Sequence, residues 1–214
     1  MSRLGPSAST PFARLAVAAG AAVACLVLAG CISVFPKANP SQLYRFGFVS
    51  PPASAEASSA GGPVVGRGRV VFQEAAATDR ILTVSGHEAA YIASARWVSP
   101  APVLFDEALA RAFLAPGGPR FAGVGGGLRA PVVLDLDVQS FEARYDQGLS
   151  APPEVVVQLH AVLIRTEDHA IIADQVFTAS KRAADNRMGP IVQAYDDAVQ
   201  EVLSNLATWT AHAA

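Results

Sequence analysis

The feature that most constrains this chain is an apolar segment near its start. Residues 15–29 are almost entirely apolar, Arg3 and Arg14 precede them, and no acidic residue lies among the first 30 positions. A basic start, an apolar centre and a small-residue end are typical of a secretory signal peptide. A membrane-spanning helix needs about 20 apolar residues, whereas this segment has about 15. We therefore expect residues 1–30 to be a signal peptide that is removed.

The segment ends in Leu28, Ala29, Gly30 and Cys31, which resembles the lipobox of bacterial lipoproteins. Small residues let a peptidase reach the bond before the cysteine, and the cysteine thiolate is the nucleophile that forms a thioether. The resemblance implies cleavage before Cys31, a diacylglycerol on its sulfur and an N-acyl chain, such as palmitate, on its amine. Two or more acyl chains hold a protein stably on a membrane. The alternative is that Cys31 is an ordinary residue behind a plain signal peptide.

These expectations limit what can stabilise the fold. Cys25 lies in the segment to be removed and Cys31 is to carry lipid, so no disulfide and no cysteine-ligated metal is expected. The remaining 184 residues hold 14 basic and 18 acidic side chains, a net charge of −4, because Arg3 and Arg14 leave with the signal. A nucleic-acid partner would require a basic face, so none is expected. No cofactor is expected besides the covalent acyl chains.

The rest of the chain divides into a short lipidated tether, residues 31–41, and one domain, residues 42–210. Ile32 stands where an aspartate often marks inner-membrane retention in enteric bacteria, which favours delivery to the outer membrane. Residues 50–66 are rich in proline, alanine, serine and glycine, and cannot bury enough apolar surface to offset their ordering entropy. We predict a flexible surface loop there. It is not a domain boundary, because the single strand before it cannot form a domain.

Hydrophobic periodicity predicts the secondary structure. Apolar residues at intervals of three and four predict helices at 103–114 and 188–209. Alternating apolar residues predict strands at 42–49, 69–73, 80–84, 87–95, 120–124, 131–144, 154–165 and 170–180. Because the strands occur in two groups that are each followed by a helix, we predict an α+β fold. Its sheet is expected to be mostly antiparallel, with the two main helices packed on one face.

Few polar side chains suggest chemistry. Asp135 and Asp137 lie two residues apart on a predicted strand, so they project from one face about 7 Å apart. They form either a carboxylate pair for acid–base or Ca²⁺ chemistry or the solvated face of a half-exposed strand. The four histidines have no metal-binding spacing, and the sequence has no nucleophile elbow and no dinucleotide-binding glycine motif. The sequence therefore gives no grounds for an enzyme or a metal site.

Aromatic residues on the apolar stripes are candidates either for the core or for a groove that binds lipid or a protein. They are Tyr91, Trp97, Tyr195 and Trp209. Large aromatic side chains dominate the energetics of both cores and interfaces, so the sequence leaves both roles open.

Several short motifs follow the lipobox in a characteristic order. They are Tyr44-Arg45-Phe46, then Asp79-Arg80-Ile81, then Tyr91, then Ala95-Arg96-Trp97 before a proline and a leucine-rich helix, and finally Ala-Tyr-Asp-Asp-Ala at residues 194–198 in a helix that ends at Trp209. This order resembles the ABC-type transport auxiliary lipoprotein family, the small lipoproteins encoded with MCE-type lipid transporters. The chain departs from it at Ala90, where many members have a second tyrosine, and in the long loop at 50–66.

The resemblance implies a non-catalytic lipoprotein on the periplasmic side of the cell envelope, anchored to the outer membrane. It would belong to a system that moves phospholipids or other hydrophobic molecules between the two membranes. The implied partners are an MCE-domain protein that forms the conduit, the ABC permease and ATPase, the membrane, and the lipid itself. Two alternatives stay open: a structural or pilot lipoprotein that assembles another outer-membrane machine, and a periplasmic hydrolase that uses Asp135 and Asp137.

Overall fold

A computed structural model of the chain describes residues 41–47, 62–115, 118–122 and 130–214. These residues belong to one compact unit, Pro40–Ala214, whereas Cys31 and its lipobox lie outside the described residues. The elements in chain order are β1 (Gln42–Tyr44), β2 (Val64–Phe72), the 3-10 helix η1 (Glu74–Ala76), β3 (Arg80–Ser85), β4 (Glu88–Trp97), α2 (Ala101–Ala112), β5 (Arg120–Phe121), β6 (Val132–Arg144), β7 (Glu154–Arg165), β8 (Ile171–Arg182) and α3 (Met188–Ala213).

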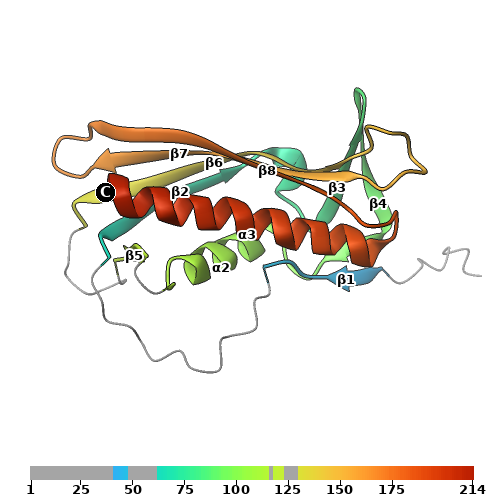
Figure 1. Cartoon of the computed structure of the whole chain (residues 1–214), viewed down its shortest axis with the longest axis horizontal. Coiled ribbons are helices and arrows are strands. Elements are labelled where there is room, and N and C mark those ends of the chain that lie inside the picture. Colours follow the sequence, from blue (N-terminus) through green and yellow to red (C-terminus); the bar gives the residue numbers. More distant parts are fainter. Residues whose placement is uncertain (1–40, 48–61, 116–117, 123–129) are drawn as a thin grey trace, which may run out of the picture. The chain divides into compact units, whose positions relative to one another are not determined.

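The described strands form one mixed sheet with β6 at its centre (Figure 1). One edge of β6 pairs with β7, and the other pairs with β2 and then β3. The prediction of a mostly antiparallel sheet is confirmed in part, because the sheet is mixed: β1–β4, β2–β5, β2–β6 and β3–β6 are parallel. The pairs β3–β4, β6–β7 and β7–β8 are antiparallel, and β6–β7 and β7–β8 are the longest pairings between the described strands. Alternating side chains occur in both kinds of strand, so the pattern that predicts a strand does not give its direction.

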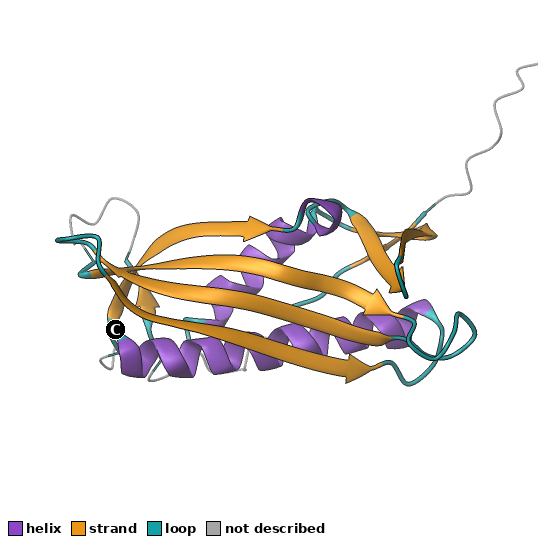
Figure 2. Ribbon diagram, turned by 90° about the horizontal axis from the view of Figure 1, so that it is seen from above, coloured by secondary structure: helices purple, strands orange, loops and turns teal. Residues whose placement is uncertain are grey.

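The two main helices, α2 and α3, lie on the same face of this sheet, as Figures 1 and 2 show. α3 packs along β7 and β8, while α2 lies between α3 and β2. The buried positions of α3 recur every three or four residues, which is the stripe that a helix needs to cover a sheet. The α+β class with two main helices is therefore confirmed. In the described part of the chain, no helix has both the length and the apolar character needed to cross a membrane.

The core between sheet and helices centres on four aromatic side chains, Phe46, Trp97, Phe141 and Tyr195, each at most 2% exposed. Ring centroids lie 5.0 Å apart for Phe46 and Trp97, and 5.1 Å apart for Trp97 and Tyr195. Edge-to-face pairs at such distances contribute about 0.5–1.5 kcal/mol beyond the burial of their area. The cluster joins Phe46, which follows β1 in the sequence, to β4, β6 and α3.

Several predicted boundaries need correction. β1 ends at Tyr44, and residues 45–47 continue without regular structure, whereas the sequence predicts a strand over 42–49. β2 begins at Val64, so the last residues of the predicted loop 50–66 are in fact strand. Val65 is fully buried there and pairs with β5 and β6, which overrides the loop-like composition around it. Residues 48–61 lie outside the described residues.

Candidate functional site

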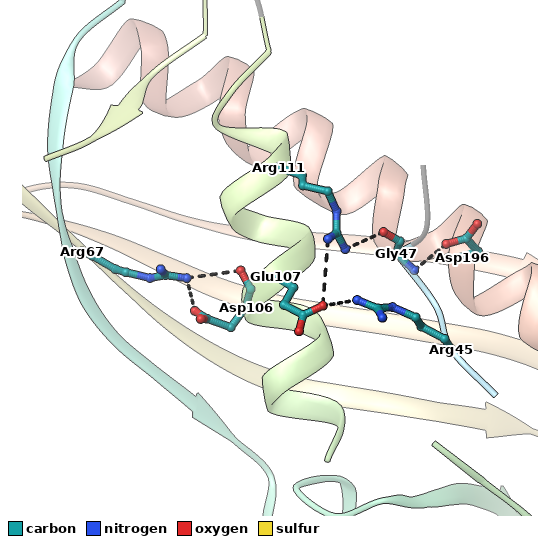
Figure 3. A network of polar contacts seen from close by, with 7 residues as sticks. All are labelled: Arg45, Gly47, Arg67, Asp106, Glu107, Arg111 and Asp196. Carbon is teal, nitrogen blue, oxygen red and sulfur yellow. Dashed lines mark hydrogen bonds and ion pairs between the residues drawn. The ribbon is translucent and has the colours of Figure 1, made fainter. Parts of the chain in front are cut away.

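Residues 45–47 fix the start of the domain to both helices (Figure 3). The Gly47 N–H donates to Asp196 Oδ1 of α3 at 2.6 Å, and the Gly47 carbonyl accepts from Arg111 Nη2 of α2, also at 2.6 Å. Arg45 forms an ion pair with Glu107 of α2, and Arg111 Nη1 lies 3.9 Å from the same carboxylate. We call these five residues the N-terminal clasp.

Glycine is required at the centre of the clasp for two reasons. Gly47 has a backbone φ of +72°, which residues with a Cβ rarely adopt. A Cβ built on Gly47 would also lie 2.8 Å from Cβ of Ala108, closer than real Cβ atoms approach. The clasp therefore depends on close contact between the backbone of the segment and α2. Its ion pairs are about 40% exposed, so they contribute more to position than to stability.

Two of the candidate aromatic residues belong to the core. Trp97 is 2% exposed and Tyr195 is fully buried. The Tyr195 hydroxyl donates to the carbonyl oxygen of Leu82 at 3.3 Å. Burial raises the pKa of Tyr195 well above its ordinary value, and the nearby carboxylate of Glu142 raises it further. These two side chains hold the sheet and α3 together.

The other two candidate aromatic residues are half-buried and have separate partners. The Arg80 guanidinium lies 3.8 Å from the ring centroid of Tyr91, and the Tyr91 hydroxyl donates to a backbone carbonyl. The Trp209 ring packs 5.7 Å from Phe177. Among the four candidates, only Trp97 and Tyr195 form a ring pair. The structure therefore does not bring the four side chains together around one groove.

Asp135 and Asp137 do share one face of β6, the face turned away from the helices, but their contacts differ. Asp135 Oδ1 accepts the backbone N–H of Arg69 at 3.0 Å, and its other oxygen lies 3.6 Å from the Arg69 guanidinium. Asp137 accepts only a long 3.4 Å hydrogen bond from the amide of Gln139. Within the described ranges, no group of three or more His, Cys, Asp or Glu side chains is placed to hold a metal ion. Among the described residues, Asp135 and Asp137 thus share a strand face but no hydrogen-bond partner.

The structure adds His160, to which the sequence analysis gave no role. His160 lies on β7 directly opposite Asp137 of β6, and its Nε2 is 3.1 Å from Asp174 Oδ2 of β8. Part of this arrangement had a sequence signal, because a hairpin that turns at residues 166–169 places His160 beside β8. The register of β7 on β6 had none, since it depends on contacts across the whole sheet.

The fold and these contacts define the chain as an α+β domain with a mixed sheet and its two main helices on one face. Its described polar residues fix residues 45–47 to these helices or form contacts at the surface. The sequence matches the family model of the ABC-type transport auxiliary lipoprotein component over residues 44–207. The chain therefore belongs to this family, which confirms the resemblance that its motifs indicate.

Solved structures share the fold. A Xanthomonas campestris protein of the DUF330 family is 21% identical, with a TM-score of 0.66 over 80% of this chain and 96% of that one. An uncharacterized protein is 13% identical, with a TM-score of 0.57 over 79% of this chain and 98% of that one. A search of curated proteins gave no match. At these identities the structural matches support the fold alone.

Proposed function

We propose that the chain is the lipid-anchored, non-catalytic accessory subunit of an ABC transport system that moves phospholipids or other hydrophobic molecules across the cell envelope. The family match over residues 44–207 carries this proposal. The lipobox ending at Cys31 supports it, because a component with acyl chains stays at a membrane surface. In this function the subunit catalyses no reaction; it binds partner proteins and is held at the membrane surface.

The distance between anchor and domain sets where such a subunit acts. About ten residues separate Cys31 from β1, and an extended chain covers at most about 35 Å over that length. Directly after β1 in the sequence, the N-terminal clasp fixes residues 45–47 to α2 and α3. The domain would therefore work close to the bilayer that holds its acyl chains, on the periplasmic side of the outer membrane.

The partners follow from this position. An MCE-domain protein would form the conduit, and an inner-membrane permease and ATPase would supply the energy. The lipoprotein would dock the far end of the conduit at the outer membrane or assist the transfer of lipid there.

Affinity purification of the full lipidated chain, with a tag at its C-terminus after α3, tests the proposal. From solubilised envelope, the MCE-domain protein and permease encoded in the same genome should co-purify with it, as identified by mass spectrometry. The Cys31→Ser variant is the control, because it should recover less of these partners when it loses its place at the membrane. Recovery of a secretin or an outer-membrane barrel, without any transporter component, would instead support a pilot lipoprotein.

A further inference from the structure

A row of side chains crosses four strands on the face of the sheet opposite the helices, the face seen from above in Figure 2. Its members are directly paired neighbours: Val71 on β2, Asp137 on β6, His160 on β7 and Val176 on β8. With strands about 4.8 Å apart, the row is about 14 Å long. Val71 and Val176 at its ends are 48% and 49% exposed.

A second row lies beside the first. It contains Asp135 on β6, Val162 on β7 and Asp174 on β8, again as direct neighbours. We call the seven residues of the two rows the open-face patch. A shallow hollow of about 450 Å³ lies over part of it. Arg69 and five patch residues, Val71, Asp135, Asp137, His160 and Val162, line this hollow, whereas Asp174 and Val176 do not. Apolar and acidic side chains are therefore neighbours on this part of the sheet.

The charge of the patch restricts what can cover it. Among the described residues, Arg69 pairs with Asp135, whereas Asp174, whose side chain is 63% exposed, pairs with His160, and Asp137 accepts from the amide of Gln139. The carboxylates of Asp137 and Asp174 thus have no lysine or arginine partner among the described residues. Two copies of the chain meeting through this face would bring carboxylates together, and an anionic bilayer surface would repel them. A positively charged protein surface would be attracted.

We propose that the open-face patch is a docking surface for a partner polypeptide that presents lysine or arginine side chains beside apolar ones. The cations would meet Asp137 and Asp174, and the apolar side chains would pack on Val71, Val162 and Val176. Such surfaces combine charge complementarity, which selects the partner, with apolar contact, which slows dissociation. The proposal stands on the patch alone and does not depend on which envelope machine the chain serves.

Photo-crosslinking in living cells tests it with the full lipidated chain. A benzophenone amino acid would replace Val71 or Val176, and matched controls would replace Leu114 or Leu149, which are 78% and 70% exposed outside the patch. We expect the patch positions to crosslink to a polypeptide that the control positions do not reach. Peptide mapping should place lysine or arginine close to the crosslinked residue.

Charge changes give the decisive comparison. Asp137→Asn combined with Asp174→Asn keeps the shape of the patch. It should weaken binding of the mapped synthetic peptide by about tenfold, because two exposed ion pairs would be lost. Asp197→Asn on the exposed side of α3 is the control and should change nothing. Asp137→Lys should abolish binding, and a glutamate in place of the peptide's cation should restore it. Circular dichroism would confirm that each variant is folded.

Three outcomes would overturn the proposal. The first is a crosslink only to a second copy of the chain or to lipid. The second is a mapped peptide without basic residues. The third is an unchanged affinity in the doubly amidated variant.

Discussion

Gly47 is the residue on which the N-terminal clasp depends. Both its N–H and its carbonyl are bonded to helices, and its φ of +72° sets the direction of both groups. Phe46 beside it is fully buried in the aromatic cluster. The segment is thus fixed by one apolar side chain and one backbone position, with the exposed Arg45 pair as a lesser contribution.

Gly47→Ala should destabilise the domain by about 2 kcal/mol, because it adds a contact with Ala108 to the cost of a positive φ. Gly86→Ala is a matched control. Gly86 has φ of +59° but no atom within 4 Å of its Cβ position, so it should cost only about 1 kcal/mol. Urea unfolding of both variants measures the difference. Equal losses would mean that the contact with α2 is easily relieved.

Tyr195 links the core to pH. Its pKa in the folded state lies well above the ordinary value of 10.0, because burial favours the neutral phenol. Below pH 10 the phenol is neutral in both folded and unfolded chains, so its full contribution to stability is present. Above pH 10 the unfolded chain loses this proton while the folded chain keeps it. The free energy of unfolding therefore decreases as the pH rises from 10 toward the folded-state pKa.

Tyr195→Phe should separate this effect from packing. At pH 8 the variant should lose about 1 kcal/mol, the value of the hydrogen bond to Leu82. Between pH 10 and 11.5 its free energy of unfolding should decrease less steeply than that of the wild type. Tyr145, whose pKa burial also raises, would account for part of the remaining slope. Parallel slopes for the two proteins in chemical denaturation would contradict the role of Tyr195.

Among single residues, the sequence was informative where local geometry decides. The alternation along β6 placed Asp135 and Asp137 on one face, as the structure has them. It did not show that Asp137 faces His160, because that contact depends on the register between two strands. It also left Trp97 and Tyr195 open between core and groove, since an apolar stripe does not say what packs against it.

At the scale of elements, the long helices and the hairpins were predictable. β7 and β8 are joined by a short turn, so their antiparallel pairing follows from the chain itself. The parallel pairs were not predictable, because β1 and β4, or β2 and β6, come from segments far apart along the chain. In β2, tertiary pairing even turned residues with a loop-like composition into strand.

The stripe of α3 makes a quantitative prediction. Leu206 lies on the core-facing side of α3 and is 0% exposed to solvent, whereas Ser204, two residues earlier, is exposed. Leu206→Ala should cost about 3 kcal/mol through lost burial and a cavity under the helix. Ser204→Ala should stay within about 0.5 kcal/mol of the wild type. Urea denaturation measures both, and a small loss for Leu206→Ala would indicate that α3 packs loosely on β7 and β8.

At the scale of the whole molecule, the two faces of the sheet have different surroundings. The N-terminal clasp lies on the helix-covered side, where Gly47 contacts α2 and α3. The open-face patch lies on the other side, which α2 and α3 leave uncovered (Figure 2). The contacts of residues 45–47 with α2 and α3 therefore do not involve the patch. In an anchored accessory subunit, this separation would allow attachment and partner binding at the same time.

The anchor itself gives the last prediction. Cys31→Ser removes the thiol to which diacylglycerol would be attached, so the protein should carry no acyl chains and leave the membrane fraction. Each buried CH₂ contributes about 0.8 kcal/mol to membrane binding, so losing the chains removes most of the affinity. Cys25→Ser, within the predicted signal peptide, is the matched control and should leave acylation and fractionation unchanged.

Intact-mass analysis of both purified proteins measures acylation directly. Because the core belongs to the unit Pro40–Ala214, the midpoint of urea unfolding should not change in either variant. A wild-type mass without acyl chains, or one that still includes residues 1–30, would show that the protein is not held by lipid at Cys31.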